Sequence, residues 1–192
     1  MNNKVTTQQI VITGLLLALE IVFQIVGNYL QFGPVNINIS LVTVVLGAVL
    51  CGPLSGAVLG FFNGIITLFS PSTLAIFMPI SPIGTVITCL AKCTLAGLVA
   101  GLIFNLLKKK HQLLGLITAS ALVPIINTGL FTIFALIFFR PFLESGVSNQ
   151  FPNIWAFLIF GVIGINFLVE IGTTTLLSTS AGMILLKRNR EE

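Results

Sequence analysis

The chain has 192 residues, of which 56% are hydrophobic and only 7% are charged, and its mean hydropathy is +1.10. Soluble domains carry about 25% charged residues, so this composition excludes an ordinary soluble domain and predicts an integral membrane protein. The apolar stretches are continuous, which excludes an outer-membrane barrel, and the longest polar stretch, 140–153, is too short for a water-soluble catalytic domain.

Five apolar segments follow one another along the chain, at 11–30, 39–69, 82–107, 113–139 and 154–186. A helix rises about 1.5 Å per residue and the hydrocarbon core is about 30 Å thick, so the second segment is too long for one crossing. Gly52 and Pro53 lie near its middle, where proline interrupts a helix. We therefore predict an all-α integral membrane protein, a single transmembrane domain 1–192 with a six-helix bundle. The helices are expected at about 10–30, 38–52, 54–69, 82–107, 112–139 and 153–187.

The basic residues predict the orientation of these six helices. Lys4, the cluster at 108–110 and the group at 187–190 fall on one side only if segment 39–69 contains two helices. Basic residues prefer the cytoplasmic side, so we predict a multi-pass protein of the bacterial cytoplasmic membrane with both termini cytoplasmic. The net charge of +4 then reflects this orientation, and we expect no nucleic-acid partner. The longer loops face outward: 28–38, 70–81 and 140–153.

Three ionisable side chains lie inside the predicted membrane spans, namely Glu20, Lys92 and Glu170. A charge inside a bilayer is costly, so each is by default a candidate for a functional site. Counted from the outer helix ends, the three lie at comparable depths and can meet inside the bundle. They belong to a ligand site, or alternatively Lys92 forms a buried ion pair with Glu20 or Glu170 that holds the helices together.

Five amide side chains lie in the middle or the outer half of the spans: Gln24, Asn28, Asn63, Asn127 and Asn166. An amide donates and accepts hydrogen bonds at once, so it can recognise hydroxyl and amide groups of a ligand. Each amide could instead cap a helix break or bond a neighbouring helix. Together with two of the charged residues, the amides predict a polar pocket that opens outward. Its expected substrate-binding residues are Gln24, Asn28, Asn63, Lys92, Asn127, Asn166 and Glu170.

No pattern in the chain indicates catalysis, a metal or a cofactor. Cys51, Cys89 and Cys93 lie in apolar segments, and His111 has no usual ligand spacing with them, so we expect no metal site. No segment has the form of a phosphate-binding P-loop, so the chain is not expected to hydrolyse nucleotides. We therefore expect no catalytic residues and no cofactor.

Small residues recur at four-residue spacing, which lets helices approach closely in lipid. The series that starts at Gly52 is expected to pack the protein's own helices against one another. Gly14 and Ala18, on the first predicted helix, are separated by three leucines and leave a smooth patch. This patch packs inside the bundle or receives a helix of another protein.

With these features the sequence resembles the substrate-binding S components of energy-coupling factor (ECF) vitamin transporters. The resemblance covers nearly the whole chain. It rests on the six-helix plan, on the segment Gly14-Leu-Leu-Leu-Ala18 and on the glycine-rich run from Gly52 to Asn63. The usual motif of the family in the first helix is Ala-xxx-Ala, from which Gly14 departs conservatively.

The resemblance implies a non-catalytic subunit of an ECF-type ABC importer that binds a vitamin or its precursor with high affinity near the outer face. Loops 28–38 and 70–81 would be the gates. Gly14 and Ala18 would dock on a transmembrane coupling protein (EcfT type) that carries two cytoplasmic ATPases (EcfA type). The bundle is then expected to topple in the membrane and carry the ligand inward.

The chemistry of the polar residues makes pantothenate the first choice of substrate, because it has a carboxylate for Lys92 and hydroxyl and amide groups for the amides. Riboflavin, folate, cobalamin and a pyrimidine precursor are the alternatives within the family. Two further alternatives come from other classes. One is a structural or assembly membrane protein without a ligand, and the other is an intramembrane enzyme.

Overall fold

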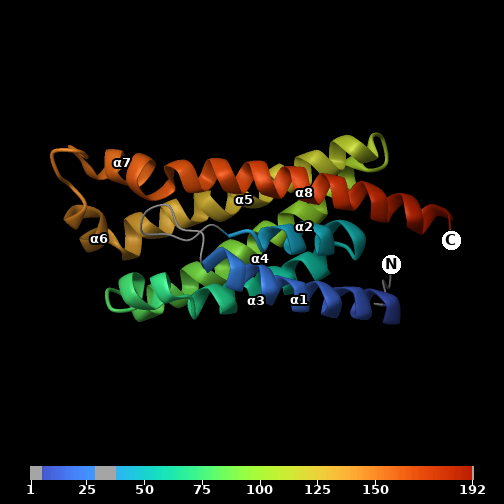
Figure 1. Cartoon of the computed structure of the whole chain (residues 1–192), viewed down its shortest axis with the longest axis horizontal. Coiled ribbons are helices and arrows are strands. Elements are labelled where there is room, and N and C mark those ends of the chain that lie inside the picture. The colour runs from blue at the N-terminus through green and yellow to red at the C-terminus, as the bar shows by residue number, and fades with distance from the viewer. Residues whose placement is uncertain (1–5, 29–37, 192) are drawn as a thin grey trace.

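The computed structural model describes residues 6–28 and 38–191, and in this part of the chain all regular structure is helical (Figure 1). The long helices are α1 (Thr7–Asn28), α4 (Pro82–Leu107), α5 (Gln112–Phe138) and α8 (Gly164–Glu191). The shorter ones are α2 (Leu41–Leu50), α3 (Pro53–Leu68), α6 (Arg140–Ser145) and α7 (Ile154–Ala156). Two segments are π-helical, η1 (Thr73–Phe77) and η2 (Phe157–Ile163).

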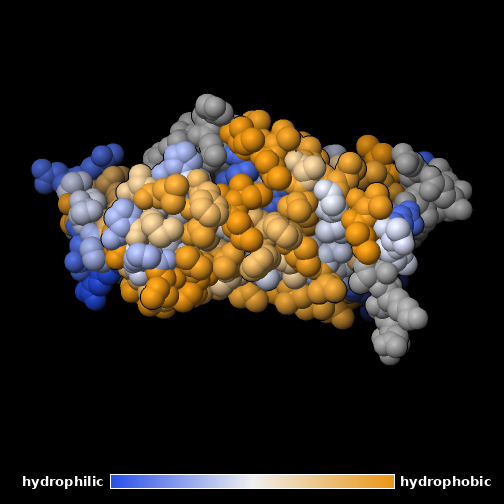
Figure 2. All heavy atoms as spheres, turned by 90° about the horizontal axis from the view of Figure 1, so that it is seen from below, coloured by the Kyte–Doolittle hydropathy of each residue, from blue (hydrophilic) through white to orange (hydrophobic). Residues whose placement is uncertain are grey.

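Four helical stretches are long and apolar enough to cross a membrane: Thr7–Gly27, Pro82–Leu107, Gln112–Phe138 and Ile154–Lys187. The helices α2 and α3 are shorter but also apolar. Figure 2 shows an apolar belt over the middle of the visible face, with hydrophilic residues gathered at the end that holds α6. These features confirm the predicted all-α membrane protein with a bundle of about six helices.

The connections alternate between the two ends of the bundle as predicted. The start of α1, the α2–α3 turn, the α4–α5 turn and the end of α8 lie at one end (Figure 1). The segment after α3 and the helix α6 lie at the other end. The basic residues at 108–110 and Lys187 are therefore at the same end, which is the arrangement that the charge pattern indicates.

The short helix α2 lies in the centre of the bundle. It contacts α1, α3, α4, α5 and α8, and every residue from Leu41 to Val49 is buried. A helix that is apolar on all sides is stable only when it is surrounded, either by protein or by lipid. The surrounding helices therefore determine the position of α2.

The interruption predicted at Gly52 and Pro53 is present. Gly52 has a φ of 99°, a conformation that glycine adopts without steric cost, and Pro53 begins α3. Beyond this turn, α3 and α4 pack closely, because a side chain at Gly60 would overlap the backbone carbonyl of Cys93. The glycine series thus packs the protein's own helices, as expected from its spacing.

Two predicted helices have other boundaries in the structure, and two predicted loops contain short helical segments. The helix expected at 38–52 is shorter, because Asn38 to Ser40 form a hydrogen-bonded turn before α2. The helix expected at 153–187 begins as α7 and η2 and changes direction at Gly164, whose φ and ψ are −12° and −98°. The loops 70–81 and 140–153 contain η1 and α6. Apolar periodicity does not distinguish a π-helical segment from an α-helical one, so it does not predict η1 and η2.

Candidate functional site

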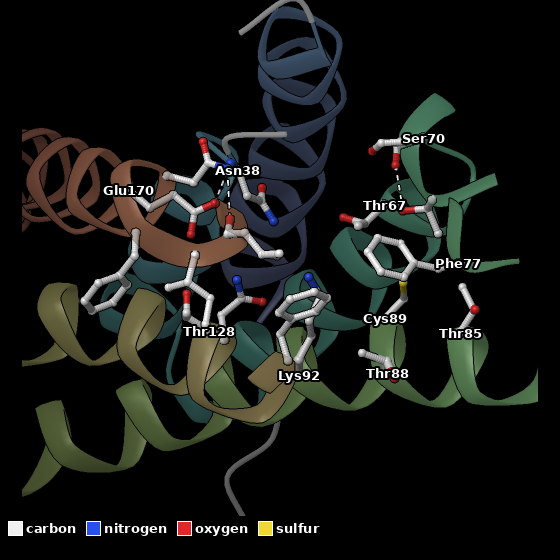
Figure 3. Close-up of a pocket in the computed structure, with 18 of the residues that line it drawn as sticks. Asn38, Thr67, Ser70, Phe77, Thr85, Thr88, Cys89, Lys92, Thr128 and Glu170 are labelled. Carbon is white, nitrogen blue, oxygen red and sulfur yellow. Dashed lines mark hydrogen bonds between the residues drawn. The ribbon is translucent and has the colours of Figure 1, made fainter. Parts of the chain in front are cut away.

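A polar cavity lies between the helices, near the end of the bundle that holds η1 and α6 (Figure 3). The empty space, including the part that is open to the outside, is about 770 Å³. Its walls come from α1, α3, η1, α4, α5, η2 and α8 and from the turn before α2. Concave sites with a few convergent polar groups are typical of small-molecule pockets.

A buried hydrogen-bond network supports one wall of the cavity. The Ser40 hydroxyl donates to Gln24 Oε1 at 2.8 Å and accepts from the Asn63 amide. The Asn38 Nδ2 atom donates to Asn63 Oδ1 at 2.9 Å. Asn63 is fully buried and does not line the cavity, whereas Gln24 and Asn38 do. The role of Asn63 is therefore to position two residues of the wall from behind.

Glu170 joins the last helix to the turn before α2. Its Oε1 atom accepts a hydrogen bond from the backbone N–H of Asn38 at 2.8 Å, as Figure 3 shows. The Glu170 side chain is only 5% exposed, and it lines the cavity. This bond fixes the chain directly after the segment 29–37, which lies outside the described residues.

Lys92 lines the cavity without a carboxylate partner among the described residues. None of their carboxylate oxygens lies within 4.0 Å of its ammonium group, and the one ion pair among them joins Arg140 to Glu144 in α6. The Lys92 Nζ atom lies 5.5 Å from the centre of the Phe131 ring. The alternative that Lys92 forms a buried ion pair with Glu20 or Glu170 is therefore wrong for this structure. Glu20 instead lies against Thr43, with 3.2 Å between the hydroxyl and Oε2, and does not line the cavity.

Asn127 and Phe131 are four residues apart on α5, so they face the cavity together. The Cys93 thiol lies 3.4 Å from Asn127 Oδ1 and the same distance from Asn63 Oδ1. On α8, Asn166 also lines the cavity, and its Nδ2 atom donates to the Val162 carbonyl at 3.4 Å. The amides predicted on α5 and α8 thus reach the same space as Lys92.

Hydroxyl groups form the other side of the cavity. Thr85 donates to the Ser81 carbonyl at 2.8 Å, and Thr88 donates to the Gly84 carbonyl at 2.6 Å. Ser70 donates to the Thr73 hydroxyl at 2.8 Å. In Figure 3, Thr85, Thr88 and Ser70 lie on the side away from Glu170 and Asn38.

Phenylalanine rings complete the wall. Phe77 packs edge to face on Phe131, with 5.8 Å between the ring centres and 85° between the planes. It also lies 4.9 Å from Phe139. All three rings line the cavity. Because they pack on one another at steep angles, they form an apolar wall and not a parallel pair of rings.

The structure brings five of the seven predicted substrate-binding residues to this cavity: Gln24, Lys92, Asn127, Asn166 and Glu170. Asn63 lies behind the wall, and the side chain of Asn28 lies outside the described residues, as does most of the predicted gate 28–38. The predicted gate 70–81 contributes Ser70, Ser72, Thr73 and Phe77 to the wall.

The sequence reasoning missed the hydroxyl side of the cavity. A signal was present, because Thr85, Thr88, Cys89 and Lys92 are spaced three, four and seven residues from the first and so share one face of α4. Asn38 was also missed. It precedes the apolar run of α2, and no periodicity indicates which way a residue in a turn points.

The helix α1 presents two different faces. Leu16, Glu20 and Gln24 are four residues apart and buried. Gly14 and Ala18 are exposed, and a side chain at Gly14 would meet no atom within 4 Å. Leu15, beside them, is 72% exposed. Within the described chain this small-residue patch therefore does not pack against another helix.

Comparison with known proteins adds one match. The sequence model of the family described as "ECF transporter, substrate-specific component" matches residues 8–181. No curated protein and no solved structure is significantly similar to the chain.

Proposed function

Because the chain belongs to the substrate-specific components of ECF transporters, we propose that it captures pantothenate at the outer face of the membrane for import. Members of this family are non-catalytic binding subunits in the cytoplasmic membrane. Membership implies a small-molecule substrate and partners of the EcfT and EcfA types. The family match therefore excludes the intramembrane enzyme and the structural protein without a ligand.

The observation that carries the choice of pantothenate is the mixture of polar groups around the cavity. A lysine without a carboxylate partner within the described residues suits the carboxylate of pantothenate. The amide of Gln24 suits its amide, and the threonine hydroxyls suit its two hydroxyl groups. Phe77 and Phe131 supply an apolar wall for its gem-dimethyl group.

The shape of the cavity argues against the other vitamins considered. Phe77 and Phe131 meet at 85°, so they do not form a parallel pair between which a flat isoalloxazine or pterin ring could stack. Cobalamin has several times as many atoms as pantothenate, and its size disfavours it for a cavity enclosed between the helices. A pyrimidine precursor that lacks an acid group leaves Lys92 without an anion.

Delivery of the ligand requires a docking surface, and we assign it to the exposed face of α1. Gly14 and Ala18 leave room for a partner helix to approach closely, and Leu15 offers apolar contact beside them. The buried face of the same helix carries Gln24 to the cavity. One helix therefore contacts both the ligand site and the proposed interface with the EcfT-type partner.

Titration of the purified protein in detergent, without its partners, tests the ligand. We expect one-to-one binding of pantothenate, which an excess of riboflavin does not displace. Native mass spectrometry of the freshly purified protein provides a second test, because a tightly bound ligand remains attached. If the protein binds riboflavin and not pantothenate, the choice of ligand is wrong while the family function stands.

A further inference from the structure

The hydrogen-bond donors and acceptors around the cavity are unevenly distributed. One region consists of Lys92, Asn127 and Phe131, and the other of Thr85 and Thr88. The two regions are called here the donor region and the acceptor region. In Figure 3, Thr88 and Thr85 lie beyond Lys92 along α4, on the side toward the end of the bundle that holds η1. The donor protons of each region that are not used in hydrogen bonds within the protein determine which part of a ligand the region can bind.

In the donor region, Lys92 carries a charge that the described residues do not neutralise at close range. Its side chain is 8% exposed, and its nearest described stabilising contact is the Phe131 ring at 5.5 Å. Glu170 attracts it only from beyond ion-pair distance, and Glu170 Oε1 is already bonded to the Asn38 backbone. A buried ammonium group gains most from an anion in direct contact. The missing anion is therefore expected from the ligand.

Asn127 provides a second donor beside Lys92. The Cys93 thiol lies 3.4 Å from its Oδ1 atom, whereas its Nδ2 group donates no hydrogen bond to a described residue and so has its two protons left for a ligand. Phe131, over which Lys92 lies, is one turn further along the same helix face. An ammonium group and an amide N–H₂ group side by side match the two oxygens of a carboxylate.

In the acceptor region, the hydroxyl protons are already used. A threonine hydroxyl has one proton, and those of Thr85 and Thr88 go to the carbonyls of Ser81 and Gly84 in their own helix. What these oxygens offer to the cavity is lone pairs. They can accept hydrogen bonds from hydroxyl or amide N–H groups of a ligand, and they repel a carboxylate.

From this distribution we infer that the cavity takes a small monocarboxylate in one orientation, with the acid group between Lys92 and Asn127 and with donor groups against Thr85 and Thr88. The inference rests on the proposed function and makes it more specific, because it names the substrate class and the direction in which the substrate lies. Neutral vitamins lack the group that the donor region requires.

A matched pair of ligands tests the acid end. Pantothenol is pantothenate with a hydroxymethyl group in place of the carboxylate, so the two differ only at this end. We expect the unchanged protein to prefer pantothenate, and Lys92→Met to lower the affinity for pantothenate about 10- to 100-fold while pantothenol binding changes little. Lys92→Arg keeps the charge and should keep the preference. Lys109→Met, which removes an exposed lysine of the α4–α5 turn, is the control without effect.

The opposite end is tested with Thr88→Val, which keeps the shape of the side chain and removes the oxygen. Away from the acid end, pantothenate and pantothenol carry the same two hydroxyl groups and the same amide, so this variant should weaken both ligands by the same factor. If Thr88→Val changes the preference between the two ligands and Lys92→Met does not, the orientation is reversed and the inference is wrong. Equal loss of both ligands in Lys92→Met, with an unchanged melting temperature, also contradicts it.

Failure of pantothenate to bind at all would contradict the proposed ligand but not the substrate class. In that case native mass spectrometry of the unchanged protein and of Lys92→Met decides the class. An acidic compound that is retained by the unchanged protein and lost from the variant supports the inference. A neutral compound retained by both proteins overturns it.

Discussion

At the scale of single residues, the cavity depends on polar groups that do not touch its interior. Asn63 is fully buried, accepts from Asn38 and donates to Ser40, which in turn bonds Gln24. Leaving a buried partner unsatisfied costs about 1–3 kcal/mol, more than the hydrogen bond itself contributes. The positions of Gln24 and Asn38 in the wall are therefore linked to one side chain on α3.

This linkage predicts the effect of Asn63→Leu. The change leaves the Asn38 amide N–H without its acceptor and removes one of the partners of the Ser40 hydroxyl, so we expect a loss of about 1–3 kcal/mol of stability together with weaker ligand binding. Thermal unfolding in detergent measures the first effect and titration with pantothenate measures the second. Thr132→Val is the control, because the Thr132 hydroxyl bonds the Thr128 carbonyl of its own helix and no other described residue. Unchanged stability and affinity in Asn63→Leu would show that the network does not support the wall.

The residue chemistry of the cavity is predictable in part from the sequence. Lys92 and Glu170 are identifiable from the sequence, because a charge inside an apolar segment is costly in free energy and so indicates a functional role. The same argument also selected Glu20, which lies against Thr43 and away from the cavity. Which face of each helix points inward depends on the packing of its neighbours. The distinction between Lys92 and Glu20 therefore requires the structure.

At the scale of the elements, apolar length and proline position predict the helices well, and irregular helix geometry is not predicted. Pro82 begins α4 at the predicted residue, and Ser81 caps it by accepting from the Gly84 N–H at 3.3 Å. The π-helical segments η1 and η2 both contribute to the cavity, through Phe77 and through Val162 and Ile163. Such segments are frequent at functional sites, but hydropathy carries no signal for them.

The two faces of α1 predict that docking and ligand binding can be separated. Ala18→Trp places a large ring on the exposed face, so it should abolish co-purification with the EcfT-type and EcfA-type partners and pantothenate uptake by cells. Ligand binding by the isolated protein should be unchanged, because the buried face of α1 is untouched. Ile133→Trp, on the exposed side of α5, is the control that adds the same ring elsewhere. Normal uptake by the Ala18→Trp variant would mean that α1 is not the docking helix.

At the scale of the whole molecule, the distribution of basic residues predicts the number of helices that cross the membrane. Seven of the nine basic residues fall on one side only when the segment around Gly52 and Pro53 turns back. The structure contains this turn, and the start of α1 and the end of α8 lie at the same end of the bundle (Figure 1). The cavity lies toward the opposite end, with η1 and α6. The orientation predicted from the basic residues would therefore place the cavity at the outer face of the membrane.

Cysteine labelling of intact cells tests this orientation. The native residues Cys51, Cys89 and Cys93 are all buried, so a membrane-impermeant maleimide is expected to label the unchanged protein poorly. Ser148→Cys, between α6 and α7, should react in intact cells, because that end faces outward. Lys109→Cys, in the α4–α5 turn, should react only after the cells are opened. The reverse pattern would place the cavity on the cytoplasmic side, where it has no access to an external vitamin, and the proposed capture step would then be wrong.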